Sequence, residues 1–165
     1  MRILTLFLSL TIITTLSFGQ SEVPRVDIRN FDFETFNTGD IANEGKPIII
    51  SFWATWCAPC KRELNNIADE WEYWEETGVK VYAVSIDDSR TVSTVQSYVN
   101  GQEWPYEVLI DENSEFRRAM NVNNIPHTFL LDGTGKVVYQ HNGYSPGDEE
   151  EIFELIEKLN RGESL

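Results

Sequence analysis

A nearly continuous apolar segment, PIIISFW at Pro47–Trp53, constrains the fold more than any other part of this sequence. A strand that is apolar on both faces must lie inside a covered sheet, so this segment predicts a buried central strand. Directly after it, the apolar residues change to a helical spacing of three or four. They predict one helix that begins at the cysteines and carries an apolar stripe of Cys57, Cys60, Leu64, Ile67, Trp71 and Trp74.

Strands and helices alternate along the rest of the chain. Further strands are predicted at Val79–Ile86, Tyr106–Ile110, Thr128–Leu131 and Val137–His141, with the turn DGTG at 132–135 between the last two. Helices are predicted from a cap at Asp87, Asp88 or Ser89 to about Asn100, at Asn113–Met120, and on the apolar stripe of Ile152–Leu159. Residues 21–45 are less regular and are compatible with an added strand or hairpin. The alternation predicts an α/β fold, a central mixed sheet with helices on both faces.

The N-terminal segment MRILTLFLSLTIITTLSFGQ has the layout of a secretory signal peptide. A positive charge at Arg2 precedes an apolar run, and small residues at Ser17 and Gly19 place the cleavage site before Gln20. Residues 1–19 are therefore predicted to be removed, which leaves 20–165 as a single domain with its core at about 45–160. This arrangement predicts a periplasmic protein. An uncleaved membrane anchor is the alternative, because Ile3–Phe18 approaches the length of a membrane span.

The net charge excludes one class of partner. It is −14 for the whole chain and −15 without residues 1–19, because that segment holds one base and no acid. A surface this acidic repels phosphate backbones, and no basic stripe offsets it. Nucleic acid is therefore not expected as a partner.

Cys57 and Cys60 are the only cysteines, and they lie together in WATWCAPCKRE. A structural staple explains them weakly, because closing so short a loop contributes only about 2 kcal/mol. A metal site is a second hypothesis, but His127 and His141 lie far downstream and fit no classical zinc pattern. Copper held by the two sulfurs and His127 remains conceivable. We expect neither a metal nor another cofactor.

A redox couple fits the spacing best. Residues three apart on a first helical turn are close enough for an unstrained disulfide, whose Cα atoms lie roughly 4.4 to 6.8 Å apart. The helix N-terminus lowers the pKa of the Cys57 thiol and favours its nucleophilic thiolate. Pro59 limits this effect, because it has no N–H to donate. Cys60 lies on the apolar stripe and is predicted to be the buried thiol that resolves a mixed disulfide.

These residues resemble the thioredoxin superfamily, and within it the exported TlpA/ResA-like branch of thiol-disulfide oxidoreductases. The resemblance rests on GKPIIISFWATWCAPCKRE at 45–63, VKVYAVSID at 79–87 and NNIPHTFLLDGTGKVVYQHNGY at 123–144, followed by the closing helix. Together these segments cover most of the chain in the family's order. They imply a thioredoxin-like fold in which Cys57 is the nucleophile and Cys60 is the resolving thiol.

The resemblance also implies roles for residues around the cysteines. Pro126 matches the family's cis proline, which leaves the backbone of Ile125 free to pair with a substrate peptide. Trp56 and Pro59 match the residues that flank the cysteine pair, and we expect all four residues to contact substrate. Glu63 matches an acid under the active site of some members, where a half-buried carboxyl has a raised pKa and can exchange protons with the resolving thiol. The alternative for Glu63 is a solvated helix acid.

Some positions depart from the family's pattern. Ser51 stands where classical thioredoxins carry a buried aspartate, so Glu63 is the available proton carrier. His127 directly follows the proline, where an imidazolium would favour the Cys57 thiolate. The alternative is that His127 is a partly exposed strand residue. We expect His141 at the surface.

The sequence thus predicts an exported thiol-disulfide oxidoreductase that reduces disulfides of exported proteins. By analogy with the family, a membrane-bound donor supplies its electrons, and cytochrome c maturation is a common role; we expect a monomer. A peroxiredoxin-type thiol peroxidase shares the fold, but Ala54 stands three residues before Cys57, where those enzymes carry threonine or serine. A non-enzymatic metal carrier or binding module is the third alternative.

Overall fold

A seven-stranded mixed sheet organises residues 22–165, the part of the chain that this computed structural model describes. The strand order is β2-β1-β5-β4-β3-β6-β7, and the middle strands β3 (Ile48–Trp53), β4 (Lys80–Ser85) and β5 (Glu107–Ile110) are parallel. The outer strands are antiparallel to their neighbours and comprise β6 (His127–Leu131), β7 (Val137–Asn142), β1 (Asp27–Asn30) and β2 (Thr35–Asn37). The predicted signal peptide, residues 1–19, lies outside the described residues. Among residues 22–165, no helix has the length and apolarity that a membrane span requires.

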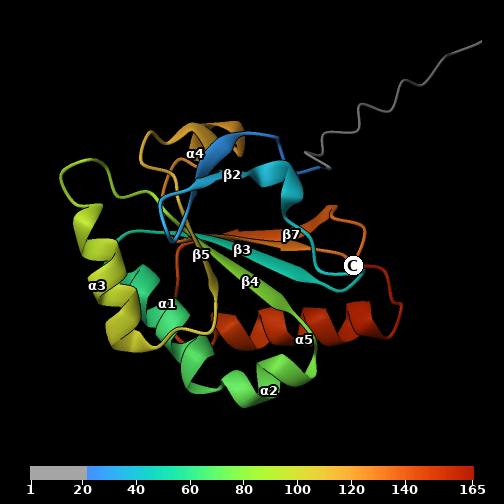
Figure 1. The fold of residues 1–165 in the computed structure, drawn as a ribbon. Helices are drawn as coiled ribbons and strands as arrows, with labels where there is room; N and C mark the ends of the chain where they lie inside the picture. The colour runs from blue at the N-terminus through green and yellow to red at the C-terminus, as the bar shows by residue number, and fades with distance from the viewer. Residues whose placement is uncertain (1–21) are drawn as a thin grey trace, which may run out of the picture.

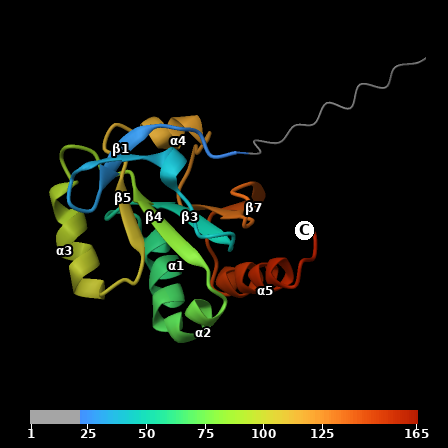
Figure 2. The same ribbon diagram turned by 45° about the vertical axis from the view of Figure 1, so that its right-hand side comes forward.

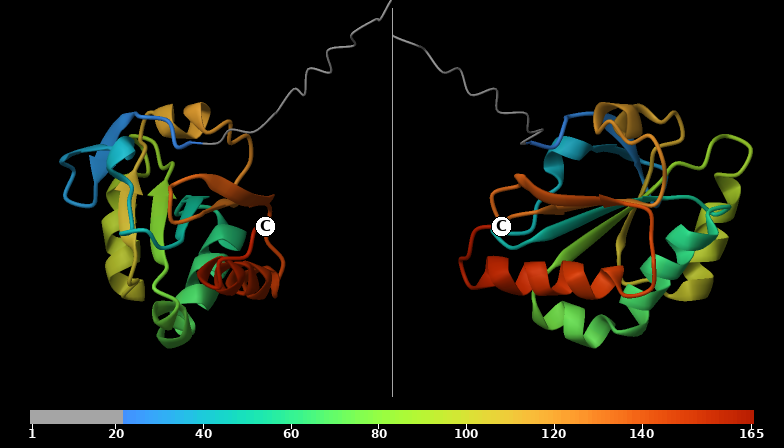
Figure 3. Two further views of the ribbon diagram at one scale, coloured as in Figure 1. Left: turned by 90° about the vertical axis from the view of Figure 1, so that its right-hand side faces the viewer. Right: turned by 180° about the vertical axis from the view of Figure 1, so that it is seen from behind.

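Helices cover both faces of the sheet, as the sequence predicts, but unequally (Figures 1 and 2). One face carries four helices, α1 (Ala58–Asp69), α2 (Trp71–Glu76), α3 (Ser93–Gln102) and α5 (Asp148–Asn160). The other face carries α4 (Glu115–Ala119), which is seen opposite α5 in both views of Figure 3. Strands β3, β4 and β5 step in one direction across the sheet, so right-handed crossovers place α1 and α3 on the same face. The chain then reverses its direction and crosses the opposite face through α4 to reach β6.

The central strand β3 lies in the core, and all six of its residues are buried. Its Trp53 packs edge-on against Trp104 with ring centroids 4.7 Å apart. Phe52, which points to the other face, packs against Phe116 of α4 at 5.3 Å. The strand is apolar throughout because it has covered faces on both sides. The irregular segment before it forms the β1–β2 hairpin, followed by a short 3-10 helix at Thr38–Asp40.

The helix predicted to run from the cysteines to Trp74 is in fact two helices, α1 and α2, interrupted at Glu70. Glu70 has φ −110° and ψ 21°, outside the helical range. Trp71 packs edge-on against Tyr106 at 5.5 Å, and Trp74 packs edge-on against Phe153 of α5 at 5.3 Å. The apolar spacing continues through the interruption because both tryptophans are packed against other elements.

The helix predicted to be capped by Asp87, Asp88 or Ser89 begins later, at Ser93. Asp87 is buried, and its carboxylate accepts hydrogen bonds from the Thr55 N–H (2.8 Å), the Thr55 hydroxyl (2.6 Å) and the Ser85 hydroxyl (2.8 Å). Its side chain therefore holds the loop that precedes the cysteines and does not cap a helix.

Asp87→Asn should destabilise the oxidised protein by about 1 to 3 kcal/mol, because it replaces one of the two buried carboxylate oxygens that accept these three hydrogen bonds by a donor NH₂. Denaturant unfolding measures the change. Asp88→Asn is the matched control, since the neighbouring Asp88 makes an ion pair with the solvent-exposed Arg90 and accepts hydrogen bonds only from the adjacent turn, so that its substitution should change stability little. Equal effects of the two substitutions would contradict the role of Asp87 in holding the loop.

Candidate active site

The cysteine pair lies where β3 passes into α1, at the carboxyl end of the central strand. In α/β sheets this end is where functional residues gather. Cys57 is the N-cap of α1, and its Sγ accepts a hydrogen bond from the Cys60 N–H at 3.3 Å. The two residues form a disulfide with a Cα–Cα distance of 5.4 Å, within the range expected from their spacing. Pro59 occupies the first turn of α1, where it donates no N–H.

The two sulfur-bearing residues differ in their access to solvent. Cys57 keeps 6% of its surface exposed, whereas Cys60 keeps none. Cys60 is the more buried of the two, as predicted, although Cys57 is also more deeply buried than an exposed nucleophile would be. Trp56, immediately before it, is 61% exposed. A second molecule can therefore reach the disulfide only through Cys57.

A cis proline lies at the same end of the sheet. The Ile125–Pro126 peptide is cis, as the resemblance implies, and Pro126 is buried. Strand β6 begins at the next residue, His127, which pairs with Phe52 of β3. Since Phe52 is the next-to-last residue of β3, this register brings Pro126 to the strand end that leads to Cys57. The backbone of Ile125 makes no hydrogen bond to any of the described residues.

Glu63 lies one helical turn after Cys60 and is completely buried. Its Oε1 accepts a hydrogen bond from the Thr128 hydroxyl at 2.7 Å. Burial raises the pKa of the Glu63 carboxyl to about 7; the Thr128 hydrogen bond opposes the rise, and the negative charges of Asp148 and Glu149 add to it. The carboxyl therefore titrates near neutral pH, and the alternative of a solvated helix acid is wrong.

Two further polar side chains surround Glu63. The Ser51 hydroxyl, in place of the classical aspartate, is buried 3.1 Å from the Thr128 hydroxyl. His141, which we expected at the surface, has only 14% of its side chain exposed, and its Nε2 lies 3.7 Å from Glu63 Oε1. The expectation was wrong because alternate residues of an edge strand still turn toward the core. Thr128 and His141 are opposite each other in the β6–β7 register, so their side chains share that inner face.

The side chain of His127 lies on the face of the sheet opposite to that of Thr128, because the side chains of neighbouring strand residues point to alternate faces. Its ring stacks on Phe129 with centroids 4.5 Å apart, and its Nε2 lies 3.1 Å from Gln140 Oε1. Burial lowers the pKa of the His127 imidazole, which favours the neutral form. The geometry therefore fits the alternative of a partly exposed strand residue and does not supply an imidazolium for Cys57.

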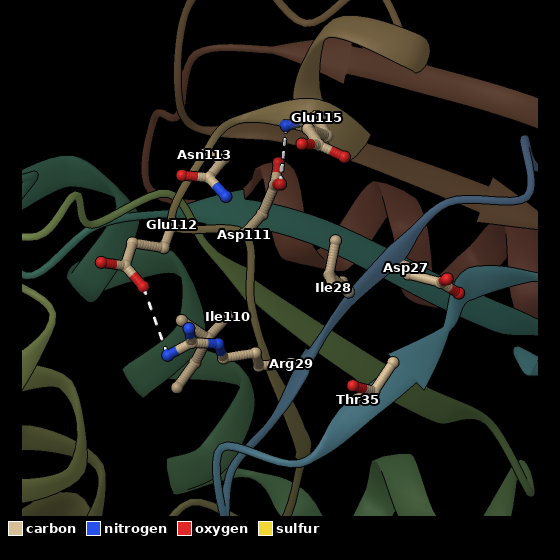
Figure 4. Close-up of a pocket in the computed structure, with 9 residues that line it drawn as sticks. All are labelled: Asp27, Ile28, Arg29, Thr35, Ile110, Asp111, Glu112, Asn113 and Glu115. Carbon is tan, nitrogen blue, oxygen red and sulfur yellow. Dashed lines mark hydrogen bonds and ion pairs between the residues drawn. The ribbon is translucent and has the colours of Figure 1, made fainter.

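A separate pocket lies between the β1–β2 hairpin and the segment from β5 to α4 (Figure 4). Its acids already hold the fold: Asp111 accepts hydrogen bonds from three backbone N–H groups of α4 at 2.7 to 3.2 Å, and Glu112 pairs with Arg29 at 3.4 Å. Neither cysteine lines this pocket. Within residues 22–165, no three or more His, Cys, Asp or Glu side chains are grouped as metal ligands would be. The cysteine pair remains the candidate active site.

Relatives of this chain are found among thiol-disulfide oxidoreductases. A model of the AhpC/TSA family matches residues 20–140. The thiol-disulfide oxidoreductase ResA of Bacillus subtilis (strain 168) is 29% identical over 118 residues, which are 72% of this chain and 64% of that protein. The ResA of Oceanobacillus iheyensis is 31% identical over 106 residues, 64% of this chain and 53% of that protein. The chain thus spans less than two thirds of the length of these curated relatives.

Solved structures share the fold. An uncharacterized thioredoxin-like protein from Porphyromonas gingivalis is 44% identical, with a TM-score of 0.75 over 84% of this chain and 92% of that one. A putative thiol:disulfide interchange protein DsbE from Chlorobium tepidum is 24% identical, with a TM-score of 0.74 over 88% of this chain and 99% of that one. These likenesses confirm the thioredoxin-like fold that the sequence predicts.

Glu63→Gln should make the stability of the protein less dependent on pH. The pKa of Glu63 is about 7 in the folded protein, against an ordinary value of 4.5 for an unfolded chain. The stability that the neutral carboxyl provides is therefore complete below the unfolded pKa and is lost as the pH rises through the folded pKa. Between about pH 5 and pH 8 the wild type should lose roughly 2 to 3 kcal/mol from this group, and the variant should not. Urea unfolding at both pH values measures the difference.

Glu70→Gln provides the control, because Glu70 is an exposed acid at the end of the same helix. This control should keep the wild-type dependence on pH. If Glu63→Gln loses as much stability between pH 5 and pH 8 as the wild type does, Glu63 does not titrate in this range.

Proposed function

The chain belongs to the AhpC/TSA family, and from that premise we propose that it is an exported thiol-disulfide oxidoreductase that reduces disulfides of exported proteins. The observation that carries the proposal is the Cys57–Cys60 disulfide at the N-terminus of α1, at the end of a central strand. Because a bond that closes so short a loop stabilises a fold little, a redox function explains it better than a staple does. The names of the curated relatives support the same reaction.

In the dithiol state, Cys57 is the attacking sulfur. Its N-cap position places Sγ at the positive end of α1, close to the Cys60 N–H, and both features stabilise a thiolate. The thiolate attacks one sulfur of a substrate disulfide, and a mixed disulfide forms as the substrate bond breaks. Cys60 then loses its proton and attacks Cys57, which releases the second substrate thiol. Two electrons have passed from the cysteine pair to the substrate.

Glu63 is the base that we assign to the resolving thiol. It lies on α1 one turn after Cys60, is shielded from water, and titrates near neutral pH. A general base with a pKa close to the working pH can accept the proton and also release it again in each turnover. Ser51, which stands in place of the classical aspartate, does not titrate in this range.

We assign substrate contact to Trp56, Pro59, Ile125 and Pro126. Trp56 offers a large exposed aromatic surface directly beside Cys57. The backbone of Ile125 has unused hydrogen-bonding groups among the described residues, and such groups can pair with an extended peptide. Substrate binding along this backbone would hold a disulfide against the exposed edge of Cys57.

Location and partners follow from the N-terminal segment and from the stoichiometry. We assign residues 1–19 to a cleaved signal peptide and the protein to the periplasm, where disulfides persist. Each turnover leaves the protein as a disulfide, so a donor must return two electrons, and a membrane-bound donor fits this location. Cytochrome c maturation is the role that we would test first, with the protein acting as a monomer.

The Cys57–Cys60 pair should titrate reversibly as one two-electron couple. Equilibration in defined thiol buffers, followed by counting of free thiols, gives its reduction potential. A reductant should have a value near about −270 mV or below, whereas a value near about −120 mV would identify an oxidant and overturn the proposed direction. A pair that never titrates reversibly would exclude the enzyme function itself.

Cys60→Ser should trap mixed disulfides, because Cys57 can still attack a substrate and nothing can then release it. The reduced variant is incubated with a disulfide-containing exported protein, and adducts are detected by non-reducing electrophoresis and mass spectrometry. Cys57→Ser is the matched control: the buried Cys60 that it leaves should form no adduct. Adducts of equal yield in both variants would mean that Cys57 is not the attacking sulfur.

A further inference from the structure

The buried cluster around Glu63 contains two polar atoms without a hydrogen-bond partner among residues 22–165, Glu63 Oε2 and His141 Nε2. The cluster is built across three strands. Ser51 of β3 is opposite Thr128 of β6, and Thr128 is opposite His141 of β7. Because residues opposite each other in a sheet face the same side, these three side chains form one polar row next to α1.

Ser51 and Thr128 do not connect Glu63 to solvent, because both are buried. The single hydroxyl hydrogen of Thr128 can be donated to Glu63 Oε1 at 2.7 Å or to the Ser51 hydroxyl at 3.1 Å, but not to both. These hydroxyls can reverse the direction of their hydrogen bonds as the carboxyl titrates. A proton that moves toward Ser51 nevertheless remains in the core.

Two acids near Glu63 oppose its ionisation. Asp148 and Glu149, at the N-terminus of α5, raise the pKa of Glu63 through their negative charges. The hydroxyls of Tyr106 and Tyr144 also interact with Glu63, and burial raises the pKa of both, to about 12 for Tyr144. Neither tyrosine ionises near neutral pH and the two acids add negative charge, so none of these four groups supplies the positive charge that would stabilise the Glu63 carboxylate.

His141 differs from all of these neighbours in its position. Its Nε2 lies 3.7 Å from Glu63 Oε1, and its side chain still reaches solvent over 14% of its surface. Tyr139 packs edge-on against the imidazole at 6.3 Å, and His127 interacts with it electrostatically from the next strand. The two ring nitrogens of an imidazole can accept a proton on one side and donate one on the other, and an imidazolium would supply the positive charge that the carboxylate lacks among these acids.

We propose that His141 is the proton-exchange partner of Glu63: it accepts the proton that Glu63 takes from the resolving thiol and passes it to solvent. This inference rests on the proposed function, because the resolving thiol must supply the proton. The separation of 3.7 Å closes to hydrogen-bond distance with a small shift of either side chain, as proton-transfer contacts do during turnover. His141 is a positioning and proton-exchange residue and does not touch the substrate.

The resolving step needs only the protein, the bound substrate and water. The Cys60 S–H bond breaks, and its electron pair forms the sulfur–sulfur bond to Cys57 while the mixed disulfide breaks and releases a substrate thiolate. The proton goes from Cys60 to Glu63 and then to His141 Nε2, and the imidazolium releases a proton to water. The substrate thiolate takes a proton from water, so no further oxidant or reductant is needed.

The reaction of the reduced full-length protein with dithiobis(nitrobenzoate) tests this role, because each of the two sulfur attacks releases one coloured thiolate. The first release reports attack by Cys57, and the second reports resolution by Cys60. At neutral pH, His141→Gln should slow the second release about tenfold or more and leave the first unchanged, since positioned proton transfer contributes factors of this size or larger. The pH profile of the second release should lose its inflection near neutrality. In His141→Ala, added imidazole should restore part of the rate.

His127→Gln is the matched control, because it is the same histidine-to-glutamine substitution on the neighbouring strand, but on the opposite face of the sheet. It should keep the fast second phase; because His127 interacts electrostatically with His141, the inflection of the pH profile can move but should not be lost. In a Glu63→Gln background, loss of His141 should cause no further slowing. If both His141 variants keep the rate and pH profile of a wild type that releases two thiolates per protein, the role of His141 is overturned and the proposed function stands. A wild type that never closes the Cys57–Cys60 disulfide would overturn both.

Discussion

The burial of β3 is the constraint on which the rest of the structure depends. Both faces of the strand are covered and both edges are paired, by β4 and β6, so all six of its residues are buried. The chain can leave this buried environment only at the ends of the strand. Its carboxyl end leads within four residues to Cys57 and the start of α1. The hydrophobic effect thus places a reactive sulfur at the surface edge of the core, at a helix N-terminus that favours its thiolate.

Two buried acids, Glu63 and Asp87, follow the cysteine pair in sequence and show how the surroundings of a carboxyl decide its use. Asp87 accepts three hydrogen bonds from Thr55 and Ser85, and these donors compensate its burial. Glu63 accepts one hydrogen bond, from Thr128, and has acidic neighbours in α5. The first acid therefore holds the loop before Cys57 in place. The second acid has a pKa raised to about 7, as the proton exchange proposed for it requires.

Local sequence patterns predicted the parts of the fold that depend on neighbouring residues. The run at Pro47–Trp53 predicted the central strand, and the spacing after it predicted a helix with Cys60 on its buried side. The same patterns were wrong at Glu70, where the helix is interrupted, and at Asp87, which looked like a helix cap. At His141 no local signal exists, because a histidine between two exposed polar residues of an edge strand is typical of a surface position. At Asp87 and His141 the deciding contact comes from an element distant in the sequence.

The sequence by itself determined the order of strands and helices, the place of the cysteine pair at a strand-to-helix junction, and which cysteine is the more buried, because hydrophobic period and residue type are local properties. Only the tertiary structure decided which polar groups meet. Strand register sets Ser51, Thr128 and His141 in one row, and the packing of α1 on that row buries Glu63 against it. The pKa of that carboxyl is set by burial and by charges from distant segments, and no pattern along the chain records them.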